Sequence, residues 1–440
     1  MSGPRWQAGE DLFREFQALG RASLLVDIQD SHSGNMAVRR TGPNGEDEIV
    51  ITATGSQKGD LEPSQICFLS ATETDYGYYK ASSETDIHAR ILALPGVGAS
   101  MHAHLKDLIL ATLDDAPKPS RPPDFVPVDP LARHHLGASI PVDWFAVPSG
   151  SPELARVIPE RLAAHPLTII FGHGAMAKGR TLREAFFRLC VGNYAGAVVR
   201  GLEKLGLDAG AVRGAIAAGP GPAFAAPPPD YEAEGDERCD FREEEEIRRE
   251  FVKAGHRLFE SRLSPFHTGS MSVRGVATML YAPKASMPRD IGGPLLSVPL
   301  AAVPADDAET ALHKAIYAAS DFQSVMHCHI PEAEALAHFA YPGETAPADR
   351  IIPIDAEGSF LYLVIPVLPP DVTAPALIRS LHEYKVAVVR GGGVWAVGAQ
   401  SLSEVLHHPS SLREICLYRI GAVERGLDLR RMEPKKAQRW

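Results

Sequence analysis

The sequence has no uninterrupted apolar run long enough to cross a lipid bilayer. Its first residues, MSGPRWQAGEDLFREFQ, lack the basic and then apolar pattern of a secretory signal. The five cysteines are scattered and include no Cys-x-x-Cys pair, which is typical of reduced thiols in a cytoplasm. We therefore expect a cytoplasmic protein that has no membrane partner.

Basic residues are also in deficit, because 44 lysines and arginines stand against 55 acidic residues and the net charge is -11. Such a charge disfavours binding to nucleic acids and to anionic lipids, so neither is expected as a partner. A phosphorylated metabolite can still bind at a local site. The 440 residues are 45% hydrophobic and 22% charged, which is typical of a globular protein with two domains.

The chain contains an internal repeat, in which three blocks recur in the same order. The pairs are HSGNMAVR (32–39) with HTGSMSVR (267–274), SSETDIH (82–88) and MHAH (101–104) with DAETALH (307–313) and MHCH (326–329), and FGHGAMAKG (171–179) with RGGGVWAVG (390–398). Three blocks in order indicate a tandem duplication.

Between the copies lies GPGPAFAAPPPDYEAEGDER, which is rich in proline, glycine and alanine and then acidic. This composition is typical of a linker. We therefore predict a first domain at 1–215, a linker at 216–242 and a second domain at 243–440.

Each copy has a similar coarse pattern of secondary structure. In the first, apolar residues at helical spacing over 12–19 predict an opening helix, and a second helix is expected around 83–93. A strand leads into MHAH, a late strand at 167–171 ends at Gly-His-Gly, and a long closing helix covers 182–205. This mixture predicts helices packed over a sheet, in an α/β or α+β fold.

The residues that can carry chemistry are concentrated in the first copy. His102 and His104 are two apart on an expected strand, so their side chains point to the same face. Such a pair alone is more often two histidines on a half-exposed strand. His173 favours a site, because it lies in a Gly-His-Gly turn where glycines permit close approach. Three neutral imidazoles with one open position are the ligand set of a catalytic zinc.

Three short polar motifs accompany the histidines. Glu84 follows Ser82-Ser83 at an expected helix start, and such serines are good helix caps. A helix N-terminus flanked by hydroxyls also attracts anions, so the two interpretations are compatible. Gly34-Asn35 and Thr54-Gly55 form turns with small side chains, and each taken singly is more often only a turn.

The motif order GN, TG, SSE, HxH and HG resembles the class II aldolase/adducin family, and within it the fuculose-phosphate aldolases. The resemblance covers about residues 8–210 and, more loosely, 243–430. It implies two tandem domains, each with a central, mainly antiparallel sheet covered by helices. The implied roles are zinc binding by His102, His104 and His173, acid/base catalysis by Glu84, and phosphate binding by Gly34, Asn35, Thr54, Gly55, Ser82 and Ser83.

The resemblance further implies a metal-dependent lyase acting on a small phosphorylated ketose, with a small phosphorylated sugar or aldehyde as substrate. Zinc stabilises the enediolate that carbon–carbon cleavage leaves, and a carboxylate moves the proton, ideally with its pKa raised towards neutrality. Fe²⁺, Mn²⁺ or Co²⁺ also fits the site. Dehydration, decarboxylation and iron-dependent oxygenation at the same metal remain open, as does a non-enzymatic, adducin-like scaffold.

The second copy retains only part of the site. The residues that match Glu84, His102, His104 and His173 are Glu309, His327, His329 and Gly392. Asp307 and Ala308 replace the two serines, and a carboxylate there repels a phosphate dianion at short range. We therefore predict one metal ion per chain and a non-catalytic second domain.

The family forms four-fold rings with active sites near subunit boundaries. Two copies in one chain then imply a homodimer that forms a pseudo-four-fold ring. The family's aldolases use tyrosines, some from a neighbouring subunit, to protonate the leaving aldehyde, and residues 121–147 contain none. The second copy is the expected source, with Tyr341, Tyr362 and Tyr384 as candidates.

Overall fold

The computed structural model describes residues 10–30, 32–42, 45–70, 74–75, 80–116, 121–217, 244–265, 268–283, 295–301 and 307–434. Contacts divide the chain into two compact units, one formed by residues 1–127 and 135–196 and the other by 128–134 and 197–440. Residues 218–242 of the proposed linker lie outside the described residues. The proposed domain limits at 215 and 243 follow the sequence repeat and remain a prediction.

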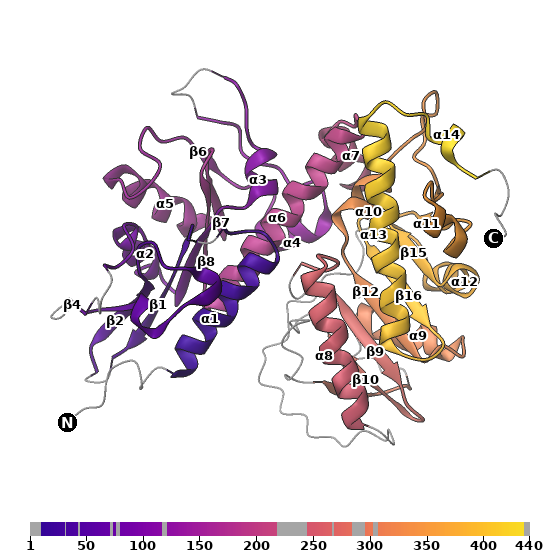
Figure 1. Ribbon diagram of the computed structural model, residues 1–440, viewed down its shortest axis with the longest axis horizontal. Helices are drawn as coiled ribbons and strands as arrows, with labels where there is room; N and C mark the ends of the chain where they lie inside the picture. The colour runs from indigo at the N-terminus through magenta and orange to yellow at the C-terminus, as the bar shows by residue number, and fades with distance from the viewer. Residues whose placement is uncertain are drawn as a thin grey trace. The chain divides into compact units, whose positions relative to one another are not determined.

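The first unit is built on an eight-stranded sheet with the order β4-β3-β2-β1-β5-β8-β7-β6 (Figure 1). Its neighbours pair antiparallel, except β6 and β7, which are parallel. The strands are β1 (Asn35–Thr41), β2 (Asp47–Thr52), β3 (Ile66–Ser70), β4 (Thr74–Asp75), β5 (Ala99–Ala103), β6 (Val142–Asp143), β7 (Leu167–Ile170) and β8 (Gly174–Gly179).

Helices cover both faces of this sheet (Figure 1). The helices between residues 10 and 217 of the chain are α1 (Glu10–Leu25), α2 (Thr85–Leu92), α3 (Lys106–Leu110), α4 (Pro130–Leu136), α5 (Pro152–Ala164), α6 (Leu182–Lys204) and α7 (Ala209–Ala217). On one face α2 and α5 share a core that includes Ile87, Ile158 and Met176. On the other, α6 approaches β7 so closely that a Cβ added at Gly192 would lie 2.9 Å from Leu167.

The second unit contains a sheet with the order β11-β10-β9-β12-β16-β15-β14-β13 (Figure 1). Its strands are β9 (Ser270–Arg274), β10 (Thr278–Ala282), β11 (Leu296–Pro299), β12 (Ser324–Cys328), β13 (Arg350–Ile351), β14 (Ile365–Leu368), β15 (Val386–Val389) and β16 (Gly393–Gly398). Its helices are α8 (Glu244–Glu260), α9 (Ala308–Ala318), α10 (Pro331–Leu336), α11 (Ala356–Leu361), α12 (Ala374–Tyr384), α13 (Leu402–Glu424) and α14 (Leu429–Met432). Here α9 and α12 pack on one face and α8 and α13 on the other.

The two sheets share one order over seven strands, since β3-β2-β1-β5-β8-β7-β6 corresponds to β11-β10-β9-β12-β16-β15-β14. The register agrees as well: Met36 pairs with Met101 in the first sheet, and Met271 pairs with Met326 in the second. The predicted tandem duplication, and the fold of a mainly antiparallel sheet covered by helices, are therefore confirmed.

The sequence patterns predicted the main elements of the first copy. The opening helix, the helix around 83–93, the strand at 167–171 and the closing helix at 182–205 appear as α1, α2, β7 and α6. The strand leading into the His-x-His motif ends at Ala103, so His104 lies one residue beyond it. Within the described residues, no helix is both long and apolar enough to span a membrane.

Candidate metal centre

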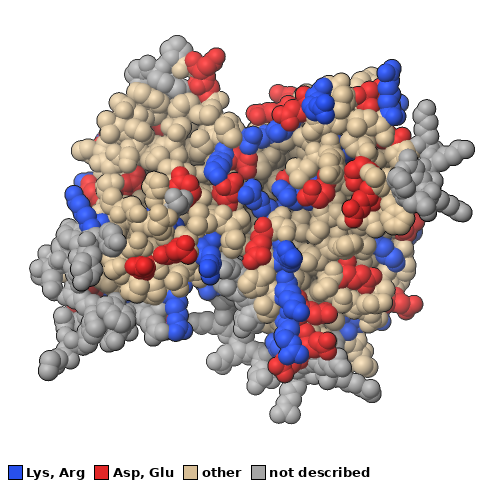
Figure 2. Space-filling model, viewed as in Figure 1, with Lys and Arg blue, Asp and Glu red and all other residues tan. Residues whose placement is uncertain are grey.

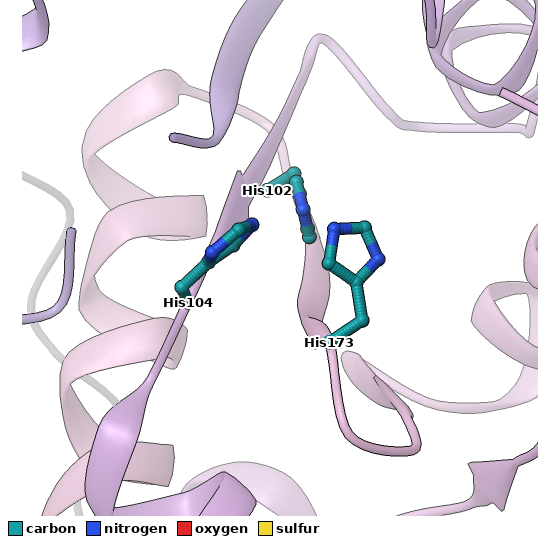
Figure 3. A group of neighbouring side chains, drawn as sticks. All are labelled: His102, His104 and His173. Atoms are coloured by element: carbon teal, nitrogen blue, oxygen red, sulfur yellow. The ribbon is translucent and has the colours of Figure 1, made fainter. Parts of the chain in front are cut away.

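Three histidines of the first unit converge on one point. His102 lies on β5, His104 directly follows that strand, and His173 lies in the turn between β7 and β8. Their ring centroids are 4.8–5.1 Å apart, and one ligand atom from each lies within 4.8 Å of the others. Figure 3 shows the three rings gathered face to edge around this point. Among the described residues they form the one group able to hold a metal ion.

The nitrogen atoms of this group fit a metal. His102 Nδ1 donates to the carbonyl oxygen of Ala175 at 3.0 Å, which leaves Nε2 as the atom with a free lone pair. This Nε2 is buried without a hydrogen-bond partner, as is Nδ1 of His173. Buried polar atoms without partners are costly, and a bound cation would remove that cost. A backbone carbonyl that fixes the ring through its other nitrogen is typical of metal-binding histidines.

The protonation states of the histidines also suit a cation. Burial, together with the positive charge of its two neighbours, lowers the pKa of His104 to about 4. Burial and the charge of His102 lower the pKa of His173 as well. Both imidazoles are therefore neutral near pH 7, and neutral imidazole is the form that binds metal.

The glycines around His173 have a steric role. A Cβ added at Gly174 would lie 2.6 Å from Cε1 of His102 and 3.1 Å from Cδ2 of His104. Gly172 has a φ of +68°, a conformation that glycine adopts at no steric cost. The Gly-His-Gly turn therefore lets β8 approach the other two rings closely enough for His173 to join them.

Glu84 lies beside the triad at the N-terminus of α2, with Oε2 4.0 Å from Nε2 of His102. Its side chain makes no capping hydrogen bond. Instead Oε2 accepts a hydrogen bond of 2.8 Å from Nδ2 of Asn35, while the buried Oε1 has no partner. The carboxylate is thus held by one oxygen and available at the other.

The pKa of Glu84 differs from the sequence expectation. Burial raises it, but the charge of His102 and the hydrogen bond from Asn35 outweigh burial, so the pKa is lowered. The expected rise towards neutrality is wrong for this state of the site. The sequence shows that a carboxyl is present, but not the amide donor and the imidazoles that the fold places around it.

The residues expected to bind phosphate lie next to one another. A β-bridge between Ala53 and Ala81 joins the Thr54-Gly55 turn to the segment before α2, where Thr54 Oγ1 donates to the carbonyl oxygen of Ala81. Asn35 Nδ2 donates to Oγ of Ser82 at 3.1 Å. Thr54, Gly55 and Ser83 are exposed, whereas Asn35 and Ser82 are buried.

Two of these positions have specific local roles. Gly34 has a φ of +70°, and a Cβ there would lie 2.4 Å from the carbonyl oxygen of His102. Ser82 does contribute to the helix start, because its Oγ accepts from the backbone N–H of Glu84 at 3.3 Å. Phosphate binding by this group of residues stays a prediction.

The sequence interpretation missed His88, which is fully buried on α2. Its Nδ1 contacts Oγ of Ser100 at 2.6 Å, and its Nε2 is hydrogen-bonded to Oδ1 of Asn35. Burial lowers its pKa to about 4, so the ring is neutral. A signal was present in the sequence, because the glutamate and the histidine four residues later recur as Glu309 and His313.

In the second unit, the residues that match Glu84 and His102 are hydrogen-bonded to each other, and the imidazole is also bonded to the backbone. His327 Nδ1 bonds Oε1 of Glu309 at 2.6 Å, and its Nε2 donates to the carbonyl oxygen of Gly392 at 2.8 Å. Trp395 stacks on the same ring, with centroids 4.2 Å apart and planes 8° from parallel. Both nitrogens of His327 are therefore engaged, in addition to the loss of the third ligand at Gly392.

Asp307, which takes the place of Ser82, has a structural role. Its carboxylate accepts from the backbone N–H groups of Glu309 and Thr310, at 2.9 and 3.0 Å, and so caps α9. A carboxylate is favourable at a helix N-terminus. Ser82 already accepts from one N–H group at the start of α2, and the carboxylate of Asp307 accepts from two at the start of α9.

Comparisons with known proteins agree with this architecture. The chain is 33% identical over 168 residues to a 5-methylthioribulose-1-phosphate/5-deoxyribulose-1-phosphate aldolase of Rhodospirillum rubrum, covering 38% of this chain and 69% of that protein. It is 30% identical to a methylthioribulose-1-phosphate dehydratase of Acidiphilium cryptum, over 40% of this chain and 83% of that protein. An l-fuculose-1-phosphate aldolase structure from Thermus thermophilus has 24% identity and a TM-score of 0.36, over 43% of this chain and 92% of that one.

The family described as Class II Aldolase and Adducin N-terminal domain matches residues 14–198 and again residues 249–420. The two matches correspond to the two sheets, and the first contains Glu84 and all three converging histidines. The chain therefore belongs to the class II aldolase and adducin family, with two copies of the family domain.

Proposed function

We propose that the chain is a metal-dependent lyase that cleaves a small phosphorylated ketose, with zinc bound once per chain by His102, His104 and His173. The observation that carries the proposal is the pairing of this triad with Glu84, whose Oε1 is buried and free beside it. A divalent cation held by the three imidazoles would supply Lewis-acid stabilisation of negative charge on substrate oxygens. The same three imidazoles also suit Fe²⁺, Mn²⁺ and Co²⁺.

In aldol cleavage of a 1-phosphorylated 2-ketose, the C4 hydroxyl loses its proton and the C3–C4 bond breaks. The electron pair remains on the three-carbon fragment as an enediolate, and C4 becomes an aldehyde. A proton added at C3 then gives dihydroxyacetone phosphate. We assign this proton transfer to Glu84, at Oε1, while Asn35 holds Oε2. The lowered pKa of Glu84 keeps it ionised, so it can take up the proton that the C4 hydroxyl loses and then give that proton to C3.

The proposed substrate carries its phosphate against Gly34-Asn35, Thr54-Gly55 and Ser82-Ser83. These residues offer hydroxyl groups and the backbone N–H groups of turns, which are suitable donors to a dianion. The net charge of -11 makes such a local site necessary, and acidic and basic side chains are interspersed on the face seen in Figure 2. The Rhodospirillum aldolase acts on 5-methylthioribulose 1-phosphate and 5-deoxyribulose 1-phosphate, so we propose a short 5-substituted ribulose 1-phosphate here.

Dehydration is the second candidate, because the Acidiphilium relative is a methylthioribulose-1-phosphate dehydratase. Purified protein with 5-deoxyribulose 1-phosphate or 5-methylthioribulose 1-phosphate distinguishes the two reactions. Cleavage releases dihydroxyacetone phosphate, which a coupled reduction detects. Dehydration keeps the carbon skeleton and lowers the substrate mass by one water. Mass spectrometry that finds neither product with either substrate would refute both candidates for these sugars.

The metal proposal gives a stoichiometry. Elemental analysis of protein purified without chelator is expected to find about one divalent metal per chain, and His173→Ala should abolish its tight binding. Gly392→His is the matched variant in the second unit. This variant should leave the metal content at one ion per chain. Glu309 and the backbone carbonyl of residue 392 engage both nitrogens of His327. Two metals in the wild-type protein would contradict the proposal, and none would favour a scaffold.

Substitution of the two glutamates is expected to have opposite effects. Glu84→Gln keeps an oxygen that accepts from Asn35 but removes the base, so kcat should fall by on the order of 10²-fold with little change in melting temperature. Glu309→Gln should leave kcat unchanged and lower stability by about 1–3 kcal/mol, because it weakens a buried bond to His327. Steady-state kinetics and thermal unfolding of both variants test this. Normal turnover in Glu84→Gln would exclude Glu84 as the proton carrier.

We also propose a homodimer in which two chains form a pseudo-four-fold ring. In it Tyr341, Tyr362 or Tyr384 would contact the C4 oxygen, pass its proton on towards Glu84 in cleavage, and return a proton to the aldehyde oxygen in the reverse condensation. Within the second unit, Tyr341 accepts from Arg419 and Tyr362 bonds His408. Sedimentation should give about twice the chain mass of 47.4 kDa. An active monomer would contradict the ring.

A further inference from the structure

A continuous series of buried hydrogen bonds leads from β5 to the carboxylate of Glu84. Ser100 contacts Nδ1 of His88 at 2.6 Å, and Nε2 of the same ring bonds Oδ1 of Asn35. Nδ2 of Asn35 then donates to Oε2 of Glu84 at 2.8 Å and to Oγ of Ser82 at 3.1 Å. Ser100 and His88 have no exposed surface.

The chemistry of the side chains fixes the direction of every bond in this series. Oδ1 of an asparagine only accepts, so Nε2 of His88 must carry the proton. Nδ1 of the neutral ring then accepts, and Ser100 donates its hydroxyl proton. With Oδ1 engaged in this way, the amide nitrogen of Asn35 faces Glu84 and Ser82, which need donors. Rotating the amide by a half turn would instead bring its oxygen against the carboxylate.

The second unit repeats this arrangement with other residues. His313 Nδ1 contacts Oγ of Ser272 at 2.7 Å, and its Nε2 contacts Oγ of Ser270 at 2.9 Å. Ser270 in turn donates to Glu309. Both copies therefore place a histidine between a serine and the residue that holds the glutamate.

The serine has changed strands between the copies. In the first sheet Ser100 of β5 pairs with Ala37 of β1, whereas in the second Val325 of β12 pairs with Ser272 of β9. The same cross-strand pair thus supplies a hydroxyl to the histidine from either side. Both copies thus keep a serine–histidine hydrogen bond, although the serine lies on a different strand in each. This indicates that the hydrogen bond itself is required.

The copies differ at the residue that touches the glutamate. The hydroxyl of Ser270 can donate one hydrogen bond, and it donates that bond to Glu309. The amide nitrogen of Asn35 can donate two, and it donates one to Glu84 and one to Ser82, which belongs to the proposed phosphate-binding residues. A correct amide orientation is therefore needed only in the first unit, where one side chain serves both groups.

We propose that His88 is a positioning residue that fixes the amide orientation of Asn35 and thereby holds Glu84 for proton transfer. The part of this inference that concerns turnover rests on the proposed function. The part that concerns orientation does not, because it describes the protein without substrate.

The kinetic experiment compares His88→Leu with His88→Gln in the full chain, with 5-deoxyribulose 1-phosphate as the probe. Leucine removes the donor, so kcat should fall by about 10-fold or more, the loss expected for one hydrogen bond to a charged group. KM should rise, because Asn35 also adjoins Ser82, and the metal content should stay unchanged. Glutamine restores an N–H donor and should recover most of kcat. Equal losses in the two variants, or none in His88→Leu, would overturn the proposal.

His313→Leu is the matched control, because His313 is equally buried at the equivalent position of the second unit. It should lower the melting temperature about as much as His88→Leu without changing kcat. A loss of kcat in His313→Leu equal to that in His88→Leu would mean that both histidines act only through stability, and would overturn the positioning role.

An NMR measurement on the wild-type protein decides the orientation even if a variant fails to fold. In ¹⁵N-histidine-labelled protein, His88 is expected as a neutral ring protonated at Nε2, with its signals assigned by triple-resonance experiments on the wild-type protein. A ring protonated at Nδ1 would place the amide oxygen of Asn35 towards Glu84 and overturn the proposal. If wild-type protein converts no ribulose 1-phosphate but His88 carries its proton on Nε2, the proposed function fails and the positioning of Asn35 stands.

Discussion

The antiparallel register between β1 and β5 is the constraint on which the site depends. It pairs Asn35 with His102, so an amide and an imidazole of the candidate metal site lie side by side on the face covered by α2. The next strand along, β8, pairs Met176 with His102 and starts immediately after His173. Because side chains alternate between the two faces of a strand, a slip of one residue between β1 and β5 would separate all of these groups.

The two copies satisfy the same buried polar groups in different ways. In the second unit Glu309 and His327 bond each other directly, and Trp395 covers the ring. In the first, the corresponding carboxylate and imidazole are 4.0 Å apart, and each keeps one buried atom without a partner. Such an arrangement is unfavourable without a ligand, and strain of this kind is typical of functional sites. The second unit therefore bonds its carboxylate and imidazole to each other, whereas the first leaves one atom of each for a ligand.

Much of the fold and part of the site could be predicted from the sequence, because both rest on local patterns. The repeat indicated the duplication, and the His-x-His and Gly-His-Gly motifs indicated the three converging histidines. His88 could not be assigned, since a histidine on the buried face of a helix is usually only a packing residue, and its partners Asn35 and Ser100 are distant in sequence. The pKa of Glu84 depends on such tertiary neighbours as well, so the rise expected from the implied chemistry is in the wrong direction.

A few differences between the copies separate the open site of the first unit from the closed arrangement in the second. Asparagine at position 35 reaches two acceptors, whereas serine at 270 reaches one. Methionine at 176 leaves the imidazole opposite it uncovered by an aromatic ring, whereas tryptophan at 395 stacks on its counterpart. With Gly392 in place of a third histidine, His327 is bonded to Glu309 rather than held open for a cation, and a buried imidazole and carboxylate that bond each other avoid the cost of lacking partners. In the second unit, the absence of a third histidine and the closure of His327 onto Glu309 therefore go together, and His313 still contacts Ser270, which donates to Glu309.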